Sequence, residues 1–184
     1  DVYKRQRPSK LADAAGTDAW DIGLIGAEPA RAEKIAFTPA YCEIEATYLV
    51  RESSPLRNIA DVDRPGSRIA VRAGSAYDLW LTRNLKHAML VRSDSADGPF
   101  NQFVAEDLDA LAGLRPQLMS EAGKLPGAKI LPGNFTAVQQ AIGTLKSNIA
   151  AAAFLREFVE EAKRSGFVAG LIARHKVVGL SVAP

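Results

Sequence analysis

Arg31 is the side chain in this sequence with the clearest capacity for chemistry. It follows a short apolar run at residues 22–25, which ends at Gly26 and leads into Glu28 and Pro29. Proline suits the first turn of a helix, and the carboxyl end of a strand is where α/β sheets bind ligands. A guanidinium there can hold a carboxylate through two parallel N–H bonds, which a lysine cannot do. The alternative is that Arg31 is an ordinary solvated helix residue.

Gly74 and Ser75 form a second place at which a ligand could bind. The apolar run at residues 69–72 predicts a strand, and the helical spacing of apolar residues from Ala76 onward predicts a helix directly after it. Gly74 allows a ligand to approach the backbone closely, and a helix that begins at Ser75 presents N–H groups to an anion. The alternative is a plain capped turn between strand and helix.

Composition excludes several other classes of function. The 184 residues are 47% hydrophobic and 24% charged, with a net charge of +2 and basic residues spread among acids, which argues against nucleic acid as a partner. No apolar run approaches the roughly 20 residues of a membrane span. Two histidines and one cysteine leave no zinc site and no internal disulfide. We expect no metal and no cofactor, and we expect Cys42 to be a buried small apolar residue.

Strands and helices alternate along the rest of the chain. Acids alternate with apolar residues over residues 41–50, which predicts a long strand. A further strand, which we expect to be buried, is predicted at 88–91, and others at 108–113 and 129–132. Helices are predicted at 9–15, 100–106 and 118–123. This order favours an α/β fold with parallel strands and right-handed crossovers.

A long helix is predicted near the carboxyl end of the chain. Ser147 or Asn148 caps it, Gly166 ends it, and a second helix follows at 167–175. Its apolar residues have a spacing of 3.6 and predict one buried stripe, formed by Ile149, Ala152, Leu155, Phe158, Val159 and Ala162.

The residues around Arg31 resemble the first-lobe ligand loop of the amino-acid-type (family 3) solute-binding proteins of ABC transporters. That loop reads Asp-(Val/Ile)-Gly, then Thr-Pro-x-Arg-x-x-x-(Val/Ile)-x-Phe-(Ser/Thr)-x-Pro-Tyr. This chain has Asp21-Ile22-Gly23, then Glu28-Pro29-Ala30-Arg31, Ile35-Ala36-Phe37-Thr38 and Ala40-Tyr41. Glu28 replaces the usual threonine, and Ala40 the usual proline. The stretch from Val71 to Ala76 resembles the second-lobe loop, Val-x-x-Gly-(Ser/Thr)-Thr, with Ala76 in place of the last threonine.

The resemblance implies a two-lobed, type II periplasmic-binding-protein-like fold with mixed parallel sheets and flanking helices. Lobe 1 would comprise residues 1–46 and 138–184, and lobe 2 residues 47–137, with crossings near 43–50 and 133–142. Family members carry a further strand–helix–strand unit before this point. We therefore expect lobe 1 to be incomplete and the sequence to be truncated at its amino end. Residues 1–6 read as neither a leader nor a strand, and we interpret them as foreign to the natural protein.

The resemblance also implies a set of ligand contacts. Arg31 would hold the α-carboxylate of the ligand from lobe 1, near Gly26 and Glu28, and the turn of Gly74, Ser75 and Ala76 would hold it from lobe 2. An aspartate that binds the ligand's ammonium group is usual where this chain has Gly113. Arg115, two residues later, suggests a second anionic group on the ligand instead, although ordinary surface charge is the alternative.

The function implied is that of an extracytoplasmic, monomeric protein without catalytic residues. It would capture an amino acid or a related organic acid between its lobes and deliver it to the membrane subunits of an ABC transporter. An enzyme on the same fold, such as a relative of cyclohexadienyl dehydratase, is an alternative in which Glu28 would act as acid or base. The effector-binding domain of a transcription regulator is another. The sequence leaves the identity of the ligand open.

Overall fold

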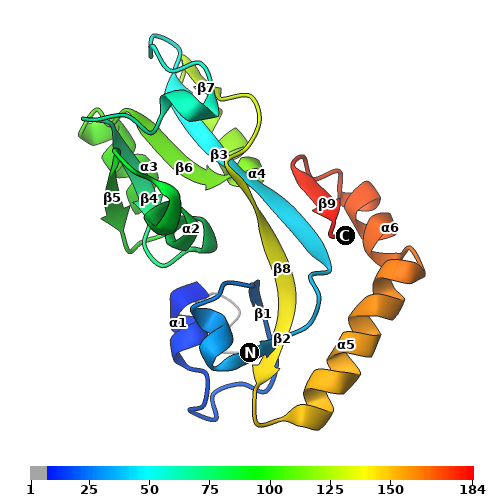
Figure 1. The fold of residues 1–184 in the computed structure, drawn as a ribbon. Helices are drawn as coiled ribbons and strands as arrows, with labels where there is room; N and C mark the ends of the chain where they lie inside the picture. The colour runs from blue at the N-terminus through cyan, green and yellow to red at the C-terminus, as the bar shows by residue number, and fades with distance from the viewer. Residues whose placement is uncertain (1–7) are drawn as a thin grey trace. The chain divides into compact units, whose positions relative to one another are not determined.

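Two long strands, β3 (Cys42–Arg51) and β8 (Thr136–Leu145), connect the two parts of the chain in the structure, a computed structural model that describes residues 8–184. The interpretation of residues 1–6 lies outside the described residues. The chain divides into unit 1, the described residues up to Ile44 with Val138–Pro184, and unit 2, Glu45–Ala137. The sequence placed the first of these boundaries at 46/47 and the second at 137/138. Each connecting strand contains residues of both units (Figure 1).

Unit 1 is built on antiparallel pairing around the connecting strands. Both β1 (Gly23–Gly26) and β2 (Ile35–Phe37) pair with β8, and β9 (Leu180–Val182) pairs with the first residues of β3. Its helices are α1 (Pro8–Asp13), the 3-10 turn η1 (Arg31–Glu33), α5 (Ile149–Arg164) and α6 (Phe167–His175). Leu155 and Val159 of α5 pack on Ile142 of β8, which fixes this helix to the sheet.

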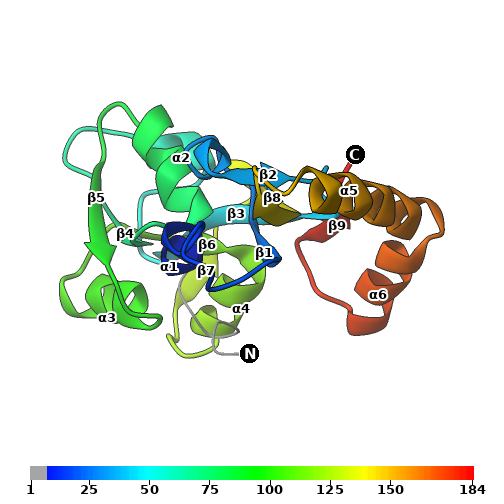
Figure 2. The same cartoon turned by 90° about the horizontal axis from the view of Figure 1, so that it is seen from below.

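Unit 2 is an α/β domain whose central strand is β4 (Arg68–Arg72). It pairs in parallel with β5 (Met89–Ser93) and β6 (Ala110–Leu114), while β3 pairs antiparallel with β6 and β7 (Ala128–Ile130). The helices are η2 (Ile59–Asp61), α2 (Ala76–Asn84), α3 (Gly98–Ala105) and α4 (Arg115–Ala122). Figure 2 shows α2 on one face of this sheet and α3 with α4 on the other. One core cluster lies on the latter face and contains Leu49, Ala70, Phe103, Leu108, Leu111 and Leu118.

Parallel strands β4, β5 and β6 confirm the predicted α/β organisation of this part of the chain. A strand is present near 88–91, but the prediction that it is buried is wrong, since Met89 is 57% exposed. The reason is position, because β5 is the outermost strand of its sheet and β4 covers it on one edge only. The helix predicted to begin at residue 118 begins at Arg115, with Pro116 in its first turn.

The long helix α5 begins as predicted, because the side chain of Asn148 accepts a hydrogen bond from the Ala151 N–H at 3.1 Å. The predicted buried stripe is only partly present. Leu155 and Val159 are buried, whereas Ile149 is 78% and Phe158 52% exposed. The helix contacts β8 through Leu155 and Val159 and also contacts α6, while its other large apolar residues remain exposed.

Candidate functional site

Arg31 lies at the carboxyl end of β1, in the short turn η1 of unit 1. Its side chain is buried at 6% exposure and donates from Nη1 to the carbonyl oxygen of Gly26 at 2.7 Å. The turn forms because the N–H groups of Arg31 and Ala32 both donate to the carbonyl of Glu28 at 3.0 Å. Arg31 is therefore not a solvated helix residue. The last residue of the strand fixes its guanidinium beside the strand end.

The charge environment of Arg31 has two opposing parts. Burial lowers the pKa of the guanidinium, and the negative charges of Glu28 and Asp13 act in the opposite direction. Arginine stays protonated in proteins even when its pKa falls somewhat. A buried cation next to the half-buried Glu28 is a setting in which a further carboxylate oxygen can accept charge-assisted hydrogen bonds.

The turn from β4 into α2 has the geometry of an anion-binding helix start. Gly74 adopts a left-handed conformation with φ of +67°, which favours glycine. Ser75 is the N-cap of α2, and its hydroxyl accepts from the Asp78 N–H at 3.1 Å. Ala76 is the first helical residue and is buried. The first N–H groups of a helix point along its axis, so this turn directs donors away from α2 toward the strand end.

Asp78 fixes this turn and was missed in the sequence. It is buried, its Oδ2 accepts from the Gly74 N–H at 2.9 Å, and its Oδ1 accepts from Arg92 Nε at 2.9 Å. The signal was present in the spacing of Ser75 and Asp78, since a hydroxyl followed three residues later by an acid marks a capped helix start. Tyr77 is buried at the same place, and burial raises the pKa of its phenol while contact with the Ser75 hydroxyl lowers it.

Gly113 lies in β6 opposite Thr47 and has no room for a side chain. A Cβ atom at this position would lie 2.9 Å from Cδ2 of Leu118, below normal contact distance. An aspartate that binds an ammonium group therefore could not stand here without moving Leu118. This packing gives a physical reason for the glycine that the sequence could not supply.

Arg115 begins α4, and other residues of unit 2 occupy its guanidinium. Nε forms an ion pair with Glu45 Oε2, and Nη2 donates to the carbonyl oxygen of Gly133 at 2.6 Å. The side chain is 17% exposed. An anionic group on a ligand would have to compete with the Glu45 carboxylate for Arg115. This competition argues against the contact between Arg115 and a ligand that the sequence suggested.

The predicted site residues thus fall into two groups, one in each unit. Unit 1 holds Gly26, Glu28 and Arg31 around the end of β1, and unit 2 holds Gly74, Ser75, Ala76, Gly113 and Arg115 at the ends of β4 and β6. The unit 1 group lies at the carboxyl end of β1, and the unit 2 group lies at the carboxyl ends of β4 and β6. The carboxyl ends of parallel strands are where α/β sheets bind ligands.

A cavity of about 380 Å³ in unit 1 has a different character. Its walls are apolar and come from β1, α5, α6 and β9, with Leu24, Tyr41, Ile142, Phe158, Phe167 and Leu171 among them. None of the predicted site residues lines it. Burial raises the pKa of the Tyr41 hydroxyl in its wall to about 12, so this group is neutral at physiological pH.

Residues 8–184 contain neither a metal-binding cluster nor a membrane-spanning helix. In that part of the chain no three His, Cys, Asp or Glu side chains gather as metal ligands would. No helix among the same residues has both the length and the apolar character needed to cross a membrane.

Solved structures of several substrate-binding proteins superpose on this chain, and so does a histidine kinase sensor domain described as similar to periplasmic binding proteins. The substrate-binding protein of an amino acid ABC transporter superposes with a TM-score of 0.74 at 18% identity, covering 90% of this chain and 75% of its own. The solute receptor for L-cysteine of Neisseria gonorrhoeae superposes with a TM-score of 0.77 at 18% identity, covering 94% and 70%. An ancestral amino acid-binding protein, described as a precursor of cyclohexadienyl dehydratase, gives 0.72 at 19% identity, covering 90% and 73%.

No protein-family model matches the chain, and no curated protein sequence matches it. The structural likeness confirms the predicted fold, which is the two-lobed α/β fold of amino acid ABC transporter substrate-binding proteins. At these identities the likeness concerns the fold alone.

Proposed function

We propose that this protein is an extracytoplasmic solute-binding protein that captures a small carboxylated ligand for uptake by an ABC transporter. The ligand is an amino acid or a related organic acid, and its carboxylate binds Arg31 from unit 1 and the Gly74–Ser75 turn from unit 2. The membrane subunits of the transporter recognise the ligand-bound form. A monomer suffices for this role.

The observation that carries the proposal is the position of Arg31. A buried guanidinium at a strand end, with its pKa lowered by burial, is the kind of perturbed charged group that gathers at binding sites. The capped turn at Ser75 supports the proposal independently, because helix starts bind anions. The N–H groups of Gly74 and Ser75 themselves donate within the protein, to Asp78 and to the Arg72 carbonyl. Fold neighbours described as amino acid-binding proteins support the choice of ligand class.

Binding by two units that are joined by two strands couples the ligand to a conformational equilibrium. Each unit supplies part of the site, so the ligand binds fully only in the closed arrangement and shifts the population toward it. The strand pair β3 and β8 would act as the hinge.

The test begins with a thermal-shift screen of amino acids, dicarboxylates and keto acids on the protein expressed from its complete gene. Calorimetry on a ligand that binds then compares Arg31→Lys with the unsubstituted protein. We expect the substitution to weaken binding by more than about 1.5 kcal/mol, because a lysine cannot replace a two-pronged charged hydrogen bond. Arg174→Lys, which changes an exposed arginine of α6, is the control and should leave affinity unchanged. Unchanged affinity in Arg31→Lys would remove this residue from the site.

A dehydratase-type enzyme is the second candidate, favoured by the neighbour described as a precursor of cyclohexadienyl dehydratase. Glu28 is the acid or base that such a reaction would use, since it lies beside Arg31. Turnover of cyclic dicarboxylates that is lost in Glu28→Gln would replace the binding proposal with this one. Binding of these compounds without turnover would support the solute-binding proposal.

A further inference from the structure

Arg115 connects the two places where the chain enters and leaves unit 2. The chain enters this unit at Glu45, in β3, and leaves it at Ala137, in β8. We call residues 45–47 the incoming segment and residues 131–135 the outgoing segment. The guanidinium of Arg115 binds the Glu45 carboxylate in the first and the Gly133 carbonyl in the second.

Other contacts fasten the two segments to each other. The Thr47 hydroxyl, which is fully buried, lies 3.0 Å from the Gly133 carbonyl oxygen and 3.4 Å from that of Leu131. The Phe135 N–H donates to the Ala46 carbonyl at 3.0 Å. These contacts join backbone to backbone or to a short side chain, and Arg115 adds a charged contact from outside the two segments.

Aromatic packing completes this arrangement on the side of α2. The ring of Phe135 lies 4.6 Å from that of Tyr48 and 5.5 Å from that of Trp80, centroid to centroid. Trp80 belongs to the helix that starts at Ser75. The outgoing segment is thus in contact with α2 through an aromatic pair and with the first residue of α4 through Arg115.

We propose that Arg115 is a positioning residue that fixes the connecting strands on the unit 2 side of the hinge and thereby limits the range of motion between the units. The inference rests on the proposed function for its role in ligand capture. The physical reason is that a planar guanidinium makes two contacts in fixed directions, so it holds both segments at one spacing. Without it, only the contacts of Thr47 and Phe135 hold the segments together, so their spacing is less fixed and the ligand-free protein samples more arrangements. The binding-competent arrangement is then a smaller fraction of the population, and apparent affinity falls in proportion.

The first experiment requires no ligand. Spin labels at Glu157→Cys in α5 and Asn101→Cys in α3, both exposed positions, report the distance between the units by pulsed electron resonance. Cys42, the one native cysteine, is replaced by alanine. We expect Arg115→Gln and Glu45→Gln each to broaden the distance distribution of the ligand-free protein. An unchanged width in both variants would overturn the inference. Glu52→Gln, which breaks the exposed pair of Glu52 with Lys129 in the same unit, is the control and should not broaden it.

The second experiment separates positioning from direct contact with ligand. Its probe is the common L-amino acid that binds the unsubstituted protein most tightly in calorimetry. If Arg115 positions the hinge, Arg115→Gln and Glu45→Gln each weaken binding by about 3- to 10-fold, and the double variant is no weaker than the worse single one. If Arg115 contacts the ligand, Glu45→Gln releases the guanidinium and tightens binding, which contradicts the inference.

The two experiments also distinguish this inference from the proposed function. Failure of every amino acid to bind would count against the proposed ligand class and leave the distance measurement as the test of Arg115. Stability of each variant is measured by urea unfolding, and a variant that does not fold is replaced by Arg115→Lys, which keeps the charge but not the planar fork.

Discussion

Glu121 has a buried carboxylate whose hydrogen-bonding capacity is only partly used. It lies in α4 at 6% exposure, and its Oε2 has no hydrogen-bond partner within the described part of the chain. Its other oxygen accepts from Gln117 Nε2 at 2.8 Å. Burial raises the pKa of Glu121, and the contacts with Gln117 and Lys124 only partly offset this while Asp97 adds to it. The native state therefore binds a proton at Glu121 more readily than the unfolded chain does.

We expect Glu121→Gln to raise the free energy of unfolding by about 1 kcal/mol at pH 7, because it removes a poorly compensated buried charge and keeps the hydrogen bond from Gln117. The sign follows from the raised pKa. The proton at Glu121 stabilises the native state fully below the ordinary glutamate pKa of about 4.3, and this stabilisation is lost as pH rises through the raised pKa. The advantage of the variant should shrink toward zero by about pH 4.

Urea unfolding of both proteins from pH 4 to pH 8 tests this. Glu106→Gln, at an exposed position of the same unit, is the matched control and should change stability at pH 7 by less than about 0.5 kcal/mol. A stability difference between Glu121→Gln and the unsubstituted protein that stays constant across this pH range would refute the assignment of a raised pKa to Glu121.

The chemistry of single residues was predictable where the sequence carries a local pattern. The position of Arg31 after a strand end could be predicted, but its burial and its bond to Gly26 depend on folding and could not. The partners of Arg115 are 70 and 18 residues away along the chain, so no local pattern reveals them. Whether the predicted residues together bind a ligand stays a prediction.

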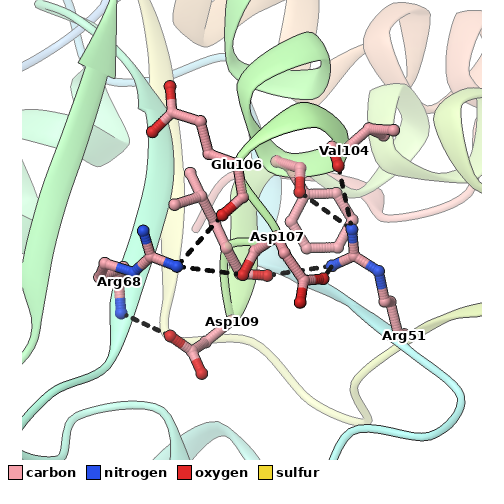
Figure 3. Close-up of polar contacts among 8 residues, drawn as sticks. Arg51, Arg68, Val104, Glu106, Asp107 and Asp109 are labelled. Atoms are coloured by element: carbon pink, nitrogen blue, oxygen red, sulfur yellow. Dashed lines mark hydrogen bonds and ion pairs between the residues drawn. The ribbon is translucent and has the colours of Figure 1, made fainter.

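At the scale of elements, an arginine from β3 stabilises the carboxyl end of α3 and the loop that follows it. Arg51, the last residue of β3, donates to the carbonyl oxygens of Phe103 and Leu108 at 3.1 Å each and pairs with Asp107 at 3.1 Å (Figure 3). Its guanidinium also lies 4.7 Å from the centre of the Phe103 ring. A cation at a helix carboxyl end satisfies carbonyls that the helix leaves unpaired.

Arg68 binds the same loop from the other side, as Figure 3 also shows. Its Nη2 donates to the carbonyls of Glu106 and Asp107, and its backbone N–H donates to Asp109 Oδ2 at 2.9 Å. Asp107 itself adopts a left-handed conformation with φ of 48°. The two arginines together hold the turn between α3 and β6 in this conformation.

We expect Arg51→Gln to lower the free energy of unfolding by about 1–3 kcal/mol, because it leaves two carbonyls at the core without their charged donor. The measurement is urea unfolding followed by far-ultraviolet circular dichroism. Lys129→Gln is the control, since Lys129 makes a 3.6 Å pair with the exposed carboxylate of Glu52 and an exposed 3.3 Å hydrogen bond to its carbonyl, and should matter by less than about 0.5 kcal/mol. Equal stability of the two variants would show that the contacts of Arg51 contribute no more than a surface pair.

The order of strands and helices was predictable because alternation and helical spacing are local. Two of the failures depended on neighbours in space. The exposure of Met89 follows from the outer position of β5, and the exposed side of α5 follows from its partial cover by β8 and α6. The start of α4 at Arg115 was a local signal that was missed, since Pro116 suits a first turn.

At the scale of the whole molecule, the two units have different surfaces. Unit 1 exposes large apolar side chains around its apolar cavity, among them Leu24 at 64%, Phe158 at 52% and Phe167 at 59%. Monomeric proteins rarely expose contiguous apolar surface of this kind. The α/β plan itself follows from the sequence and its family resemblance, but this surface does not, because the helical spacing of α5 predicts an apolar face without saying whether anything covers it.

The exposed apolar surface of unit 1 predicts that the chain of 184 residues binds the dye 8-anilinonaphthalene-1-sulfonate in its native state. The double variant Phe158→Gln, Phe167→Gln should lower the dye fluorescence by at least roughly twofold, because it removes two of the largest exposed apolar side chains at the cavity. Met89→Gln, at an exposed methionine of unit 2 that lies outside this cavity, is the control and should leave the fluorescence unchanged. Circular dichroism confirms that each variant is folded, which separates dye bound to the native surface from dye bound to unfolded chain.

Native protein that binds no dye, or a double variant that binds as much as the unsubstituted protein, would show that these two aromatic side chains do not form an accessible apolar surface in solution.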